Sequence, residues 1–168
     1  MVVRILLGLV VLVLGGVAAH ETGWKIDESH VHRHLERQLA IMRDFDLDAV
    51  CRDAAADYRM RSLQYSDDRL VLDEVLDAQA ACEQARESLR VLQDAHHRSR
   101  GLLRFDFQVE VRAVQLAPGG RSARVESVAT VKLGQRLVAR SRGHETLSRA
   151  FWRVRSHGGE SRTWMYVD

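Results

Sequence analysis

Two side chains in this 168-residue sequence combine suitable chemistry with a suitable placement for acid–base work. His34 lies beside an apolar helical stripe formed by Val31, Leu35 and Met42. Glu145 has the strand parity of a set of small residues that we expect to face inward. A desolvated carboxylate beside an imidazole has perturbed titration and can move protons. The alternative is a structural His34 and a solvated Glu145, turned outward by a bulge at the next residue.

Histidines also gather at the start of the first expected helix. Asp27, His30 and His34 share one helix face at spacings of three and four, which can hold a divalent metal. If the chain is cut after Ala19, His20 would supply an α-amine and an imidazole that chelate copper. No Cys or Met joins these four weak candidates, and their spacing matches no known site. We therefore expect a solvated helix start and no bound metal.

Motifs for other chemistry are absent from the sequence. It contains no glycine-rich phosphate loop, no Gly-x-Ser-x-Gly elbow and no Cys-x-x-Cys pair. No motif for nucleic-acid recognition is present either. We expect no cofactor, no nucleic-acid partner and neither nucleophilic nor redox catalysis.

A ligand pocket is predicted from small residues at matching heights on two neighbouring strands. Ser127 and Ala129 have inward parity on one strand, and Ala139, Ser141 and Gly143 have it on the next. They would leave a hole unless the first helix packs close enough to fill it. A mostly apolar pocket with few polar groups is the usual form of a ligand site. The predicted lining is Tyr58, Phe105, Phe107, Ser127, Ser141, Trp152 and Trp164.

The N-terminal segment has the pattern of a secretory signal peptide. Arg4 precedes an apolar run over 5–13, and small residues end the segment at Ala19. We expect cleavage there, a single domain over 20–168, and a periplasmic or secreted protein that has no membrane contact once cleaved. An uncleaved anchor is the alternative.

The two cysteines, Cys51 and Cys82, are expected to form a disulfide. An even count in an exported chain favours one bond, and both residues lie on apolar helical stripes. A pair of buried free thiols is the alternative.

The periodicity predicts three helices followed by a meander of four strands, an α+β order. The helices are expected from Asp27 or Ser29 to about Arg43, from Asp46 or Asp48 to about Tyr58, and from Ser66–Asp68 to about Arg98. The strands are expected over 105–116, over 123–133, from 136 to about 155, and over 163–167. A bulge is expected near 112–113, and turns are expected at 118–120, 134–135 and 156–160.

Two stretches carry a family resemblance. The segment 42–51 (MRDFDLDAVC), followed by Ala56-Asp57-Tyr58, resembles the first helical hairpin of the nuclear transport factor 2-like, or SnoaL-like, superfamily. The ending, with Phe151-Trp152-Arg153-Val154, a glycine turn and 163–167 (TWMYV), is similar too. The resemblance is to exported bacterial members. It implies a cone-shaped curved antiparallel sheet packed on three N-terminal helices, with a pocket at the open end. The superfamily includes isomerases, dehydratases, ligand carriers and interaction domains, so the fold does not decide the function.

The charge is unevenly distributed although the net charge is only +2. Residues 20–99 carry 11 Lys and Arg against 17 Asp and Glu, whereas residues 100–168 carry 13 against 6. Arg124, Arg140 and Arg142 are expected to project together from the outer face of the sheet. Arginine is enriched in interface anchors, so we hypothesise a contact surface for a second copy or an acidic envelope protein. The alternative is a solvated face without a partner.

Taken together, the residues favour a non-catalytic exported binding domain with an accessory or immunity-like role. It would hold a small apolar ligand or contact another envelope protein. The alternative is an isomerase- or dehydratase-like enzyme that uses His34 and Glu145 as its acid–base pair.

Overall fold

The structure is a computed structural model that describes residues 23–166. The expected signal peptide and His20 lie outside the described residues. The elements run in the order α2 (Glu28–Arg43), β1 (Ala54–Ser66), β2 (Arg69–Asp77), α3 (Ala78–Arg98), β3 (Phe105–Leu116), β4 (Ser122–Leu133), β5 (Arg136–Ala150) and β6 (Arg153–Met165). No helix in the described part of the chain is long and apolar enough to cross a membrane.

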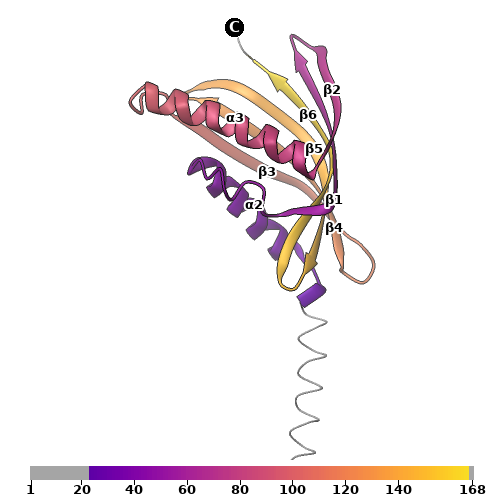
Figure 1. Cartoon of the computed structure of the whole chain (residues 1–168). Coiled ribbons are helices and arrows are strands. Elements are labelled where there is room, and N and C mark those ends of the chain that lie inside the picture. The colour runs from indigo at the N-terminus through magenta and orange to yellow at the C-terminus, as the bar shows by residue number, and fades with distance from the viewer. Residues whose placement is uncertain (1–22, 167–168) are drawn as a thin grey trace, which may run out of the picture.

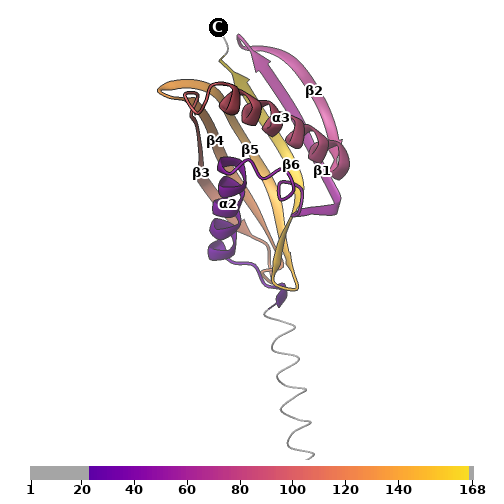
Figure 2. The ribbon, with the colours of Figure 1, turned by 60° about the vertical axis from the view of Figure 1, so that its left-hand side comes forward.

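All six strands form one curved, unclosed sheet, and both long helices lie against its concave side (Figures 1 and 2). The strand order is β2-β1-β6-β5-β4-β3. Neighbouring strands are antiparallel except β1 and β6, which run parallel. The α+β class and the curved sheet are therefore as predicted, but the sheet has six strands and is covered by two long helices rather than three.

The correction concerns residues 46–77, where two helical segments were expected. Residues 54–77 instead form a β-hairpin whose turn, Asp67-Asp68, has positive φ at both residues (50° and 58°). Such a pair suits a type I′ turn, which matches the twist of the flanking strands. The short apolar run of β2 fits a helix or a strand by periodicity alone, and the hairpin decides for the strand. The cap of α3 is consequently Asp77, whose carboxylate accepts from the Ala80 amide at 2.9 Å.

The later strands follow the predicted alternation more closely. The predicted bulge is confirmed by the register shift between Val111 and Ala113, and turns lie at 118–120 and 134–135 as expected. The last two strands differ, because β5 ends at Ala150 and the turn lies at Phe151-Trp152. The glycine-containing stretch 156–160, expected as a turn, lies inside β6.

The buried core fills one end of the sheet, where α2 packs. It joins α2 and the residue two positions before it to β4, β5 and β6, and consists of Ile26, Val31, Leu35, Ala123, Val125, Leu147 and Val154. A capping box fixes the start of α2: Asp27 accepts from the His30 amide at 3.0 Å, and the Asp27 amide faces His30 Nδ1 at 3.3 Å. The core therefore sets the position of the α2 face that carries His34.

Candidate functional site

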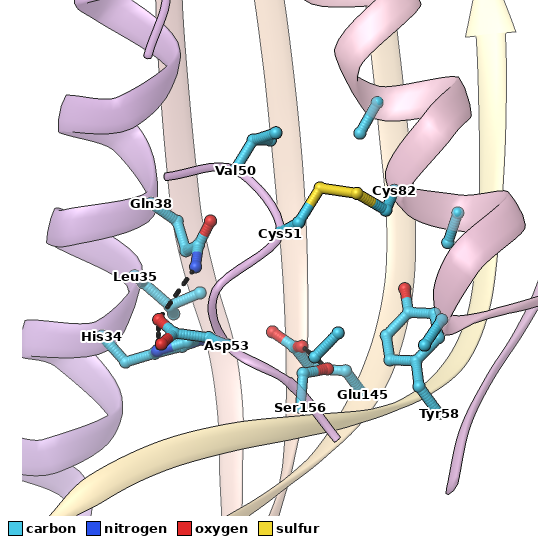
Figure 3. A pocket seen from close by; sticks show the side chains of 14 residues that line it. His34, Leu35, Gln38, Val50, Cys51, Asp53, Tyr58, Cys82, Glu145 and Ser156 are labelled. Carbon is cyan, nitrogen blue, oxygen red and sulfur yellow. Dashed lines mark hydrogen bonds and ion pairs between the residues drawn. A yellow bond between two sulfur atoms is a disulfide. The ribbon is translucent and has the colours of Figure 1, made fainter. Parts of the chain in front are cut away.

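A cavity of about 270 Å³ lies on the concave side between α2, the start of α3 and the sheet (Figure 3). Its apolar lining consists of three alanines of α3 (Ala78, Ala81 and Ala85), Val50 in the segment before β1, and Leu35 on α2. Six polar side chains from α2, the segment before β1 and the sheet line the rest, namely His34, Gln38, Asp53, Tyr58, Glu145 and Ser156. The cavity thus has the mixed lining that suits a small ligand with a polar group.

The predicted disulfide is present and forms part of the cavity wall. Cys51 and Cys82 are bonded, with their Cα atoms 5.3 Å apart. Cys51 lies in the segment between α2 and β1, not in a helix, whereas Cys82 lies near the start of α3. The bond therefore ties α3 to the segment that also supplies Asp53, and closes the cavity between them.

His34 and Asp53 form the first polar pair in the cavity. His34 is only 2% exposed, and its Nδ1 lies 3.4 Å from Asp53 Oδ2. This distance is within ion-pair range, but the geometry of the contact is not that of a hydrogen bond. Gln38 Nε2 donates to the same carboxylate oxygen at 3.2 Å. The His34 contact, with smaller contributions from the Arg37 charge and Gln38, holds the pKa of Asp53 below its usual 3.8, although partial burial opposes the shift.

The backbone of Asp53 is fixed by the sheet. The Ser156 amide donates to the Asp53 carbonyl at 2.8 Å, and Ala54 begins the pairing of β1 with β6. The carboxylate is therefore held between α2 and the end of a strand. It is rigidly placed for interaction with His34.

Glu145, Ser156 and Tyr58 form the second polar group. Ser156 Oγ donates to Glu145 Oε2 at 2.8 Å and accepts from the Gly158 amide at 3.2 Å. Burial, together with the nearby negative charge of Glu145, raises the pKa of Tyr58 to about 12. The phenol therefore stays protonated at neutral pH and is available as a donor, whereas Glu145 offers an acceptor.

The structure brings His34 and Glu145 to one cavity, as the acid–base prediction required, and adds Asp53 and Ser156. The bulge considered as the alternative is present between Glu145 and Leu147, yet Glu145 still lines the cavity and Thr146 is the exposed residue. Asp53 was missed because it fell inside an expected helix. Its position two residues after Cys51 is the signal that could have placed it near the cavity.

The other predicted pocket residues are distributed over three places. Tyr58 lines the cavity, whereas Ser127 and Ser141 line a neighbouring hollow of about 170 Å³ that Glu145 also borders. Phe107 is 3% exposed and packs its ring near Phe105, with centroids 6.5 Å apart.

The two tryptophans do not line the cavity, which corrects the prediction. Trp164 stacks on Tyr65, with ring centroids 5.4 Å apart, on the opposite, convex face. Trp152 is 58% exposed in the β5–β6 turn. The prediction placed the last turn at 156–160 and a short strand after it. In the structure the turn is at Phe151-Trp152, and β6 runs from Arg153 to Met165, so Trp152 lies in the turn and Trp164 lies on the convex face.

The weak metal candidates are divided between two roles. Asp27 and His30 form the cap of α2, with Asp27 Oδ1 and His30 Nδ1 2.8 Å apart, whereas His34 contacts Asp53. The Ser29 hydroxyl and the His30 amide lower the pKa of Asp27 to about 2. Within residues 23–166, no three His, Cys, Asp or Glu side chains gather in a way that could hold a metal.

Arg124, Arg140 and Arg142 are all exposed, on strand positions opposite in parity to the buried Ala123, Val125 and Leu147. Val128 shares their face although it is buried. A hollow on this convex face is lined by Arg140, Arg142 and Trp164, among others. Whether a second copy or an acidic protein covers this face stays a prediction.

The depressed pKa of Asp53 predicts how acid changes the stability. Because the folded state favours the ionised carboxylate, this contribution is complete above the unfolded pKa near 3.8 and is lost as the pH falls through the lower folded value. We expect Asp53→Asn to be less stable than the unaltered protein at neutral pH, with the difference shrinking below pH 4. Urea unfolding from pH 7 to pH 2 measures this, with the exposed Asp94→Asn as control. An equal difference at all pH values would contradict it.

Comparisons of sequence alone identify no relative: no family model matches the chain, and no curated protein matches it. Solved structures do match its fold. Aln2 from a Streptomyces species is 19% identical, with 82% of this chain and 89% of that one covered and a TM-score of 0.56. The beta subunit of benzoate 1,2-dioxygenase from Burkholderia mallei is 14% identical, with 85% and 95% covered and a TM-score of 0.53.

A third structure is described by its fold. It is a nuclear transport factor 2-like protein of unknown function from Silicibacter pomeroyi, 12% identical, with 80% of this chain and 93% of that one covered and a TM-score of 0.51. At these identities the likeness concerns the fold, and activities differ among proteins that share one. With its curved sheet, its two helices on the concave side and the cavity between them, the chain has the nuclear transport factor 2-like fold.

Proposed function

We propose that the protein binds a small, largely apolar molecule that carries a hydroxyl or carbonyl oxygen. The observation that carries the proposal is the two-sided cavity, apolar along α3 and polar along the sheet and α2. Its volume of about 270 Å³ lies just below the usual range for drug-sized ligands, which favours a smaller molecule.

The polar side supplies both halves of a recognition pair. The protonated Tyr58 phenol can donate to a ligand oxygen, and the Glu145 carboxylate can accept from a ligand hydroxyl. Ser156 already occupies one oxygen of Glu145 and orients it. The apolar wall of Ala78, Ala81 and Ala85 would cover the rest of the ligand.

Export to an oxidising compartment forms part of the proposal. It is supported by the disulfide, because such bonds persist in the periplasm and outside the cell and are rare in the cytosol. The role would be that of an exported binding domain in the bacterial envelope, whose cavity holds its ligand without catalysis there.

A second candidate is an isomerase- or dehydratase-like enzyme, favoured by the convergence of His34 and Glu145 on one cavity. Glu145 would remove a proton from the ligand, and the imidazole of His34, positioned by Asp53, would serve as the second proton carrier. The two candidates differ in one readout: Glu145→Gln should keep part of the binding and abolish any product detected by NMR.

The test is a thermal-shift panel of small phenols, cyclic ketones and cyclic alcohols. A ligand that binds only the folded state raises the melting temperature, so hits can be titrated for affinity. For a ketone hit, Tyr58→Phe should weaken binding about fivefold, the value of one hydrogen bond. Tyr65→Phe, on the convex face, is the matched control. The proposal would be contradicted if no compound in the panel raised the melting temperature, or if a ketone that binds had the same affinity for Tyr58→Phe as for the unaltered protein.

A further inference from the structure

Three side chains on the convex face form a continuous chain of hydrogen bonds across three strands. Ser148 on β5 lies with its Oγ 2.7 Å from His157 Nε2 on β6. His157 Nδ1 in turn lies 2.7 Å from Asp57 Oδ1 on β1. These strands are neighbours in the order β1-β6-β5, as Figure 2 shows, so the three residues meet although 91 positions separate Asp57 from Ser148.

This cluster is separate from the cavity. Leu147 and Ser156 face the concave side, where Leu147 is fully buried and Ser156 bonds to Glu145. The next residue on each strand, Ser148 and His157, therefore points to the other face. Ser148 is half-buried and the His157 side chain is 30% exposed, so reagents in solution can reach both.

The hydrogen-bond chemistry fixes the proton positions. An ionised carboxylate only accepts, so the contact with Asp57 requires the proton on His157 Nδ1. In the neutral imidazole Nε2 is then an acceptor, and the Ser148 hydroxyl must donate to it. This is the arrangement in which a histidine acts as general base toward a serine while a carboxylate holds its tautomer.

We propose that Ser148 is an esterase nucleophile activated by His157, with Asp57 as the positioning residue. Ser148 Oγ bonds to the acyl carbon of an ester and its proton passes to His157 Nε2. The alcohol leaves with that proton as the ester C–O bond breaks. Water then attacks the acyl carbon of the acyl-serine and gives one proton to His157 Nε2. The bond between the acyl carbon and Ser148 Oγ breaks, and Oγ takes back the proton from Nε2, so that ester and water become acid and alcohol.

The surrounding charge indicates the class of ester. Arg155 is the ladder partner of Ser148, and Arg124 is that of Thr146, two residues earlier on β5. Both arginines are exposed on this face, and either guanidinium can reach an oxyanion or a carboxylate at Ser148. The substrate class is therefore a small ester with an anionic group. Asp57 is 73% exposed, so water screens its effect and its contribution is smaller than in a buried triad.

A fluorophosphonate probe tests the nucleophile directly. We expect labelling of the folded protein at Ser148, identified by peptide mass spectrometry, and a labelling rate roughly 100-fold lower in His157→Gln because the general base is lost. Asp57→Asn should lower the rate less. Ser122→Ala is the matched control, since Ser122 is the ladder partner of Ser148 on β4 and lacks the histidine contact.

Hydrolysis provides the second readout. Mono-4-nitrophenyl succinate should be cleaved faster than 4-nitrophenyl acetate, and Arg155→Ala should remove that preference without abolishing labelling. Circular dichroism establishes that each variant is folded. Absence of label on the folded unaltered protein, label on another serine, or a rate indifferent to His157→Gln in a folded variant would each overturn the proposal.

Discussion

Loss of the Cys51–Cys82 bond is expected to lower the free energy of unfolding by roughly 3–4 kcal/mol, the chain-entropy value for a loop closed over 31 residues. The effect should be large because α3 depends on this tether. Leu89 is its only fully buried residue, and Arg86 adds one bond, from Nε to the Leu47 carbonyl at 3.1 Å. Without the disulfide, the wall of the cavity is held by these contacts, by the hydrogen bond from Gln84 Nε2 to Glu74 on β2, and by the Asp77 cap.

The measurement is urea unfolding with and without reductant. When reduced, the unaltered protein should fall to the unfolding free energy of the double variant Cys51→Ser with Cys82→Ser. The unfolding free energy of the double variant should be the same with and without reductant. Mass spectrometry counts the free thiols and so establishes that the bond has been reduced. If the urea midpoint of the reduced protein then equals that of the oxidised protein, the bond contributes no stability.

Gly158→Ala is expected to prevent or severely weaken folding, with a loss of at least about 3 kcal/mol from strain and overlap together. Gly158 has a φ of +80°, which side-chain-bearing residues rarely adopt, and a Cβ there would overlap the backbone of Arg59 on β1. The parallel β1–β6 pairing would have to open, and with it the placement of Asp53 and Ser156 at the cavity.

Gly134→Ala separates the two causes. Gly134 also has a positive φ, +62°, but nothing lies within 4 Å of the position that its Cβ would take. It should therefore lose only the conformational part, about 1 kcal/mol. Equal losses of unfolding free energy in the two variants would show that close approach of β1 and β6 is not what Gly158 provides.

The sequence predicted those parts of the fold that depend on local periodicity. The alternation from Phe105 onward and the change of parity at Val114 correspond to β3 and its bulge. The hairpin at 54–77 was missed because β2 is a short edge strand with leucines and valines at spacings that also suit a helix. Only pairing with β1, and through it with the distant β6, selects the strand.

The same distinction applies to the candidate site. His34 was found from its helical stripe and Glu145 from strand parity, and both line the cavity. Asp53 and Ser156 were not found, because they meet through the parallel pairing of segments about a hundred residues apart. Long-range register, which periodicity does not contain, also brings Ser148 and His157 to Asp57.

The central claim is that the cavity beside His34 and Glu145 holds a ligand. The most direct measurement takes a compound that binds in the thermal-shift panel and compares its affinity for two phenylalanine variants of α3. Ala81→Phe fills the cavity from its apolar wall, whereas Val91→Phe adds the same ring at a position that is 55% exposed. Isothermal titration calorimetry should show binding lost in Ala81→Phe and unchanged in Val91→Phe, with both variants folded by circular dichroism. Undiminished binding to folded Ala81→Phe would contradict the account.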